Sequence, residues 1–260
     1  MKEKIVFIHG LTGRKRAFHK EIDYFSQAYH TYAYDLLGHG EDRGKPVEFT
    51  LDNLVEQLEI LFDQEGIEKA HICSLSYGCY PATIFANKWK ENVLSLCYIG
   101  GHYNSPSPLF AVFQHYWDTS SENYSTWLKN YARDLFPKEG VVDPYSLVSS
   151  KVYYKYGLEL DKGILKEAIG HRLFYDLRRD LKNINVPVLW VMGDHDFLYK
   201  SSIADLKKVI PHVQYKEIPH AGHTANLFRP KSFKKIYEDF LNGIQRTKSE
   251  KVPVLKGKTL

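Results

Sequence analysis

The sequence predicts an α/β protein whose mostly parallel central sheet is flanked by helices. Short apolar runs alternate with helix-length amphipathic stretches along most of the chain, which is the pattern of a parallel sheet covered on both faces. This alternation is interrupted once, by a long stretch that is crowded with aromatic residues and holds no convincing strand. We therefore divide the 260 residues into a core (1–101 and 184–245), an inserted helical cap (102–183) and a basic tail (246–260).

Six apolar runs are the candidate strands of the core. They lie at residues 4–8, 31–34, 70–73, 93–99, 188–192 and 213–218. Short apolar runs separated by helix-length segments are typical of buried strands joined by crossover helices.

Two helices of the core are especially clear. Thr50 is a candidate N-cap for the first, and Pro230 is suited to the first turn of the second. In each, apolar residues three and four positions apart fall on one face; they are Leu51, Leu54, Val55, Leu58, Leu61 and Phe62 in the first and Phe233, Ile236, Tyr237, Phe240, Leu241 and Ile244 in the second.

The stretch from 102 to 183 is expected to cover the carboxyl edge of the sheet. Ligands of open α/β sheets bind at that edge, so aromatic residues of the insertion are candidates for the wall of a pocket. His102 lies at its entrance, where it is either a pocket wall or a surface residue. The other candidates for the pocket are Phe110, Phe113 and Trp117.

Composition excludes several classes of protein. The net charge of +4 comes largely from the end of the chain, and no basic stripe interleaved with aromatic residues suggests nucleic-acid binding. No apolar run approaches the roughly 20 residues that a membrane span needs, and the first apolar run is too short for a signal peptide, so a cytoplasmic protein is expected. Three cysteines without metal-ligand spacing are expected to be buried free thiols. The chain also lacks dinucleotide and phosphate-loop motifs, and we expect neither cofactor nor metal.

The segment from Cys73 to Gly78 has the pattern of a nucleophile elbow. An apolar strand leads into Ser74-Leu75-Ser76-Tyr77-Gly78, and helix-compatible sequence follows. A sharp strand-to-helix turn needs small residues two before and two after the nucleophile. Here the first of these positions holds Ser74 instead of glycine. Such a turn exposes the Ser76 hydroxyl and directs the amino end of the new helix at developing negative charge.

Four further motifs give residues 4 to about 242 a resemblance to the α/β-hydrolase family. They occur in the family's order, with the serine before the acid and the acid before the histidine. The motifs are His9-Gly10-Leu11, Asp35-Leu36-Leu37-Gly38-His39-Gly40, Gly193-Asp194-His195-Asp196 and His220-Ala221-Gly222-His223.

The resemblance implies a role for each site residue. Ser76 would be the nucleophile, His223 its base and Asp196 the acid that orients the base. Asp194 and His220 remain the nearby alternatives for the last two roles. The resemblance also nominates the backbone N–H groups of Leu11 and Tyr77 as the donors that would stabilise the oxyanion.

Acyl transfer is the chemistry that this set of residues implies. We expect a serine hydrolase acting on a small or medium, partly apolar carboxylic ester, without a partner other than its small-molecule substrate and in an oligomeric state that the sequence leaves open. One alternative is a carbon–carbon hydrolase, a lactonase or a lyase similar to the menaquinone-pathway synthase, which the opening His9 to Gly13 resembles. The helix after Ser76, however, lacks the arginine expected of that branch. Another alternative is a ligand-binding module without enzymatic activity.

Overall fold

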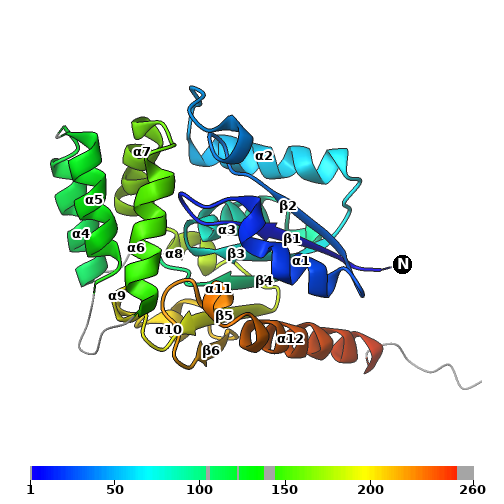
Figure 1. Cartoon of the computed structure of the whole chain (residues 1–260). Coiled ribbons are helices and arrows are strands. Elements are labelled where there is room, and N and C mark those ends of the chain that lie inside the picture. The colour runs from blue at the N-terminus through cyan, green and yellow to red at the C-terminus, as the bar shows by residue number, and fades with distance from the viewer. Residues whose placement is uncertain (1, 104–105, 122, 138–143, 251–260) are drawn as a thin grey trace, which may run out of the picture.

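A six-stranded sheet forms the centre of the molecule (Figure 1). The computed structural model describes residues 2–103, 106–121, 123–137 and 144–250. All neighbouring strands pair in parallel, in the order β2-β1-β3-β4-β5-β6. The strands are β1 (Lys4–Ile8), β2 (His30–Tyr34), β3 (Ala70–Leu75), β4 (Val93–Ile99), β5 (Val188–Gly193) and β6 (Gln214–Ile218). The expected fold class is confirmed, and each of the six apolar runs forms a strand.

The connections change direction between β1 and β3. After β1 the chain moves to the edge strand β2, and it then returns to place β3 on the other side of β1. The carboxyl end of β1 lies level with that of β3, since Ile8 is in register with Ser74. In open α/β sheets, ligands bind beyond the strand ends at such a switch point. The loop after β1 and the turn after β3 therefore meet where a site is expected.

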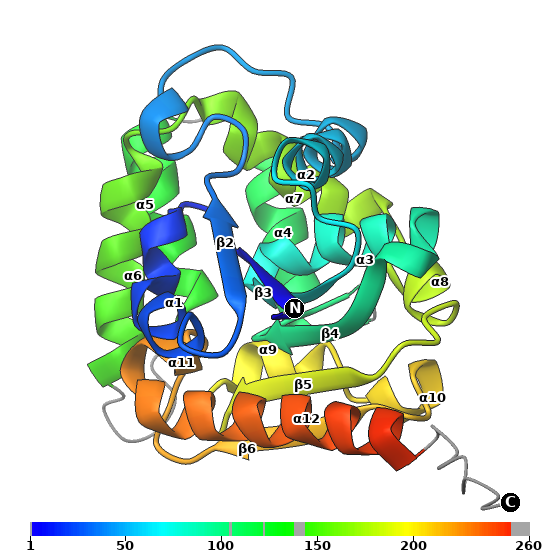
Figure 2. The same ribbon diagram turned by 90° about the vertical axis from the view of Figure 1, so that its right-hand side faces the viewer.

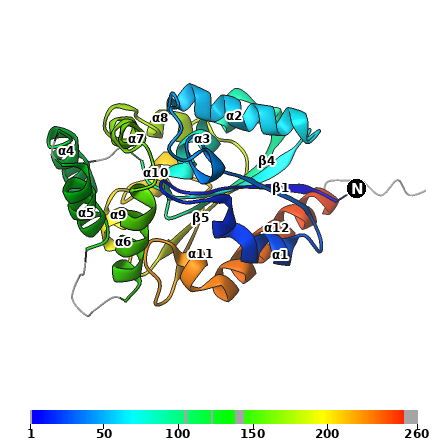
Figure 3. The same ribbon diagram turned by 45° about the horizontal axis from the view of Figure 1, so that its top comes forward.

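Helices cover both faces of the sheet, as Figures 2 and 3 show. Val6 and Ile8 of β1 point into a core cluster with α2 (Leu51–Gln64) and α3 (Cys79–Lys88). The alternate residues, Ile5 and Phe7, belong to a second cluster with α1 (His19–Phe25) and α12 (Pro230–Glu250). Because successive side chains of a strand point to opposite faces, both faces of β1 are buried, which explains its continuous apolar run.

The remaining core elements are short. They are η1 (Lys15–Phe18), η2 (Gly40–Asp42), η3 (Ser76–Gly78), η4 (Lys90–Asn92), α9 (Phe197–Ser201), α10 (Leu206–Val209) and α11 (Ala225–Phe228). Three of them, η3, α9 and α11, follow a strand or a loop at the carboxyl edge of the sheet, where their first residues can take part in a site.

Among the described residues, five helices lie between β4 and β5. They are α4 (Pro108–Asp118), α5 (Tyr124–Leu135), α6 (Pro144–Gly157), α7 (Lys162–Phe174) and α8 (Arg178–Leu181). Within the described residues this segment holds no strand, as expected. Figure 1 shows α4 to α7 standing beyond the carboxyl ends of the strands, on the side of the sheet opposite the N-terminus.

Local sequence signals account for both predicted core helices. The Thr50 hydroxyl accepts a hydrogen bond from the N–H of Asn53 and caps α2 as expected. The helix α12 begins at Pro230 but continues to Glu250, into the stretch expected to be tail. Each added helical residue gains a backbone hydrogen bond, and no proline or glycine interrupts residues 246–250. The rest of the predicted tail, 251–260, lies outside the described residues.

The cysteines and the membrane criterion give two further observations. Cys73, Cys79 and Cys97 are buried and free, as expected. No helix within the described residues combines the length and the apolar character that crossing a bilayer requires.

Candidate active site

Ser76 stands at a strained turn between β3 and α3. Its φ of +50° lies in the left-handed region, which a residue with a Cβ adopts at a cost of about 1–3 kcal/mol. Gly78 makes the turn possible, because a Cβ there would come within 2.8 Å of the His9 carbonyl oxygen and 2.9 Å of the Ile8 carbonyl oxygen. Ser74, at the other small position, is fully buried. The sequence therefore folds into the elbow that its spacing predicts, with serine accepted at the first small position.

The Ser76 hydroxyl begins a chain of two hydrogen bonds. It donates to Nε2 of His223 over 2.8 Å, and Nδ1–H of His223 donates to Oδ2 of Asp196 over 2.8 Å. All three residues are buried, with 5–8% of their surface exposed. In this arrangement the ring proton lies on Nδ1, toward Asp196, and Nε2 faces the serine as the nitrogen that can accept its proton.

The two neighbouring alternatives are placed elsewhere. Oδ1 of Asp194 accepts the N–H of Ala221 over 3.2 Å and so holds the turn that leads to His223. His220 is exposed and has a φ of +52° in the same turn. The structure thus brings Asp196, and not Asp194, to His223, and it brings His223, and not His220, to Ser76.

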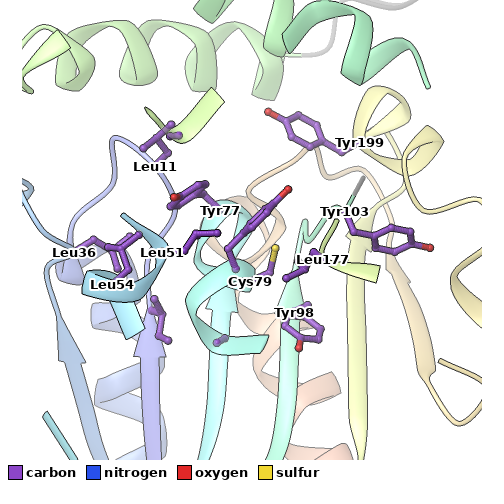
Figure 4. Close-up of a cluster of buried hydrophobic side chains, with 14 of the residues drawn as sticks. Leu11, Leu36, Leu51, Leu54, Tyr77, Cys79, Tyr98, Tyr103, Leu177 and Tyr199 are labelled. Atoms are coloured by element: carbon purple, nitrogen blue, oxygen red, sulfur yellow. The ribbon is translucent and has the colours of Figure 1, made fainter. Parts of the chain in front are cut away.

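Two features that the sequence did not reveal hold the imidazole of His223. The ring of Tyr199, at α9, stacks on it with centroids 3.6 Å apart and planes at 22°. On another side lies Gly100, whose φ is +57° and where a Cβ would come within 2.9 Å of Cε1 of His223. Figure 4 shows the ring of Tyr199 beyond the carboxyl ends of the strands, below the helices that cross the top of the view.

The loop after β1 is braced by two buried histidines. Nε2 of His9 accepts the N–H of Leu36 over 2.9 Å, and Nε2 of His39 accepts the N–H of Thr12 over 3.2 Å. Burial lowers the pKa of His9 to about 4, and burial together with the nearby His9 lowers the pKa of His39 to about 3. Both rings are therefore neutral at pH 7 and can accept these hydrogen bonds, which fix the loop that carries Leu11.

The two nominated oxyanion donors come from different parts of the chain, Leu11 from the loop after β1 and Tyr77 from the elbow itself. Leu11 lines the cavity at Ser76, while Tyr77 is the second residue of η3, where backbone N–H groups precede any intrahelical acceptor. The Tyr77 side chain is fully buried, and its hydroxyl donates to Nδ1 of His171 over 2.6 Å. The ring of Tyr77 therefore helps to anchor α7 above the elbow.

A cavity of about 480 Å³ opens onto Ser76 and His223. Its walls come from the loop after β1, from α6, from α11 and from the single α7 residue Arg172. Apolar side chains near the mouth include Val152 and Leu227. This space is large enough for a small or medium organic ligand.

None of the four residues expected at the pocket lines this cavity. His102 and Phe113 are fully buried, and Phe110 packs edge-on against Phe113. Trp117 packs against Phe174 of α7, with ring centroids 5.2 Å apart. The physical reason is that α4 buries its apolar face against α7 and α5, so its rings join helices together instead of facing the cavity.

Arg172 is a further site residue that sequence reasoning missed. A signal was present, because it falls three residues after Ile169 and four after Ala168, on the apolar face of α7. An arginine on such a face is buried when the helix packs. Its side chain is 2% exposed and reaches the cavity at Ser76.

A sequence model described as "Alpha/beta hydrolase family" matches residues 5–235. The chain belongs to the alpha/beta hydrolase family. Among curated members, Carboxylesterase YbfK of Bacillus subtilis is 24% identical, with 92% of this chain and 80% of that protein aligned. Monoacylglycerol lipase ABHD6 of Mus musculus is 23% identical over 96% of this chain and 78% of its own. This chain is thus an alpha/beta hydrolase enzyme.

Solved structures of other alpha/beta hydrolases have the same fold. The enol-lactonase from Burkholderia xenovorans LB400 superimposes with a TM-score of 0.76 at 20% identity, over 93% of this chain and 92% of that one. MenH from S. aureus gives a TM-score of 0.74 at 21% identity, over 94% of both chains. Identities this low establish the fold alone.

Proposed function

We propose that the protein is a carboxylic ester hydrolase that works through an acyl-enzyme on Ser76. The observation that carries this proposal is the pair of 2.8 Å hydrogen bonds that joins Ser76 to His223 and His223 to Asp196. The curated relatives that are named carboxylesterases support it from a separate direction.

The hydrogen bonds suggest how protons move. Nε2 of His223 takes the hydroxyl proton as the Ser76 oxygen attacks the ester carbonyl, and the imidazolium then returns that proton to the leaving alcohol. The carboxylate of Asp196 stabilises the imidazolium and keeps its proton on Nδ1. Water activated by the same imidazole then releases the acid and restores Ser76.

The negative charge of the tetrahedral intermediate needs fixed donors. We propose the backbone N–H groups of Leu11 and Tyr77 for this role, because Tyr77 follows Ser76 at the start of η3 and Leu11 lines the cavity at Ser76. Loss of one such donor typically costs 10²–10³-fold in kcat. The neutral His9 and His39 keep the Leu11 loop in place, and each donates its own Nδ1–H to a backbone carbonyl, of Gly10 and of Leu37.

The helices between β4 and β5 are proposed to act as a cap that selects the substrate. Residues of α6 and the α7 residue Arg172 form part of the cavity wall, opposite the walls formed by the core. The size of the cavity, about 480 Å³, suits a small or medium acyl group.

A covalent probe tests the nucleophile. A fluorophosphonate should add once to the wild-type protein, as measured by intact mass, and should not label a Ser76→Ala variant. Ser74→Ala is the matched control, because Ser74 is buried near the end of β3, two residues before Ser76, and its loss should leave labelling intact. Labelling of Ser76→Ala at the wild-type rate would contradict the assignment.

A substrate panel tests the reaction itself. Nitrophenyl esters of increasing acyl length should be hydrolysed, with turnover lost in Ser76→Ala and lowered by several orders of magnitude in His223→Ala. A simple lactone belongs in the panel, because it is an internal ester that the same groups would open. Probe labelling without turnover of any ester or lactone would reject the hydrolase proposal while keeping the nucleophile.

A further inference from the structure

Arg172 places a buried positive charge in the wall of the catalytic cavity. It projects from α7, is 2% exposed and lines the same cavity as Ser76 and His223. Its Nε–H donates to Nε2 of His102 over 3.2 Å, and one Nη1–H donates to the hydroxyl of Tyr131 over 3.2 Å. No residue in the described part of the chain accepts a hydrogen bond from the other N–H groups of the guanidinium, so they are available to a ligand.

Neither of these protein partners carries a compensating charge. Burial, together with the charge of Arg172, lowers the pKa of His102 well below its usual 6.5, so His102 is neutral. Burial raises the pKa of Tyr131 above its usual 10, so its hydroxyl also stays neutral. Within the described part of the chain, no carboxylate forms an ion pair with Arg172.

An unpaired buried guanidinium is costly, and its surroundings offset only part of that cost. Cζ of Arg172 lies 5.1 Å from the ring centroid of Tyr77 and 4.9 Å from that of Phe113, within the range of cation–π attraction. Buried charges in proteins are nevertheless normally paired with an opposite charge. The missing partner of Arg172 is therefore expected to come from the ligand.

The charges of the cavity wall also favour an anionic ligand. Among the described residues that line it, the charged side chains are Arg14, Arg16 and Arg172, and none is acidic. Arg14 is neutralised by an ion pair with Glu159, whereas Arg16 is exposed near the mouth. A wall of this kind attracts an anion inward and repels a cationic ligand.

We propose that Arg172 binds a carboxylate group of the substrate, so that the enzyme prefers esters that carry a free carboxylate. This inference rests on the proposed ester hydrolysis at Ser76. A planar carboxylate can accept two parallel N–H bonds from one guanidinium, and its single negative charge matches the single buried positive charge. Binding it at Arg172 would hold the ester group in the same cavity as Ser76 and His223.

Matched ester pairs test this preference. Monomethyl adipate and methyl hexanoate have the same chain length and differ by a carboxylate in place of a methyl group on the acyl side. Para-acetoxybenzoate and para-tolyl acetate make the same comparison on the alcohol side. For at least one pair, wild-type kcat/KM should favour the carboxylate member by tenfold or more. Arg172→Met should lower that ratio by about 10–100-fold, and Arg172→Lys, which keeps a point charge, should lower it less.

A binding measurement separates this inference from the catalytic proposal. Adipate should raise the melting temperature of the Ser76→Ala protein, and the shift should be absent with hexanamide and in the Ser76→Ala/Arg172→Met protein. Should Arg172→Met fail to fold, the wild-type ratios and the adipate shift decide the question without it.

Two outcomes are distinguishable. Hydrolysis of neutral esters with no preference for carboxylate members, and no adipate shift, would overturn the inference and leave the proposed function standing. A melting shift with adipate, combined with no hydrolysis of any ester, would reject the proposed function and support a carboxylate site at Arg172.

Discussion

Replacing Asp196 by asparagine removes one negative charge and leaves the shape of the site almost unchanged. The carboxylate lies 2.8 Å from Nδ1 of His223, and both side chains are 4% exposed. At an effective dielectric constant of about 20, two unit charges at that distance of 2.8 Å attract each other by about 6 kcal/mol. Since about 1.4 kcal/mol corresponds to a factor of ten, Asp196→Asn should lower kcat by about 10⁴-fold. The amide also favours the wrong tautomer of His223, which acts in the same direction.

The assay is hydrolysis of para-nitrophenyl butyrate, followed for kcat and KM separately. The loss should fall on kcat, because in the proposed mechanism Asp196 stabilises an imidazolium that exists only after proton transfer. Asp194→Asn is the matched control, since its amide oxygen can still accept the N–H of Ala221, and its loss should stay below tenfold. Equal losses in the two variants, or a loss in Asp196→Asn below about 100-fold, would refute this reasoning.

Two further predictions concern stability and access. Burial raises the pKa of Glu21 from 4.5 to about 7, so the folded state binds more protons than the unfolded state between these values and loses stability as pH rises through them. Glu21→Gln should therefore raise the free energy of unfolding in urea by up to about 3 kcal/mol at pH 8 and by almost nothing at pH 4.5; an equal effect at both values would contradict it. On α6, Val152 lines the cavity but Leu147 does not, although they are 44% and 37% exposed. Val152→Trp should raise KM for butyrate esters at least several-fold, and Leu147→Trp should not; equal KM values for the two variants would count against the cavity as the substrate site.

Much of the fold could be predicted from local sequence patterns. The apolar run from Lys4 to Ile8 predicts a strand buried on both faces, and β1 has those bounds. The elbow at Ser76 could also be predicted, because a strained strand-to-helix turn restricts which residues can occupy the positions beside it. Motif order then predicted which acid and which histidine belong with Ser76, and the structure brings together Asp196 and His223.

Which residues line the pocket, in contrast, depends on how the helices pack together. Aromatic residues such as Phe110, Phe113 and Trp117 are typical of a pocket wall. Because α4 packs against α7, these side chains instead lie in the contact between helices. Periodicity shows which face of a helix is buried, but not whether that face meets another helix or a cavity. The same limit concealed Arg172 and Tyr199. Arg172 lines the cavity at Ser76 although about a hundred residues separate the two in the chain. Tyr199 stacks on His223, which lies more than twenty residues later. The elbow at Ser76 is thus a local property of the sequence, whereas the position of the Arg172 charge in the same cavity is decided only in the folded molecule.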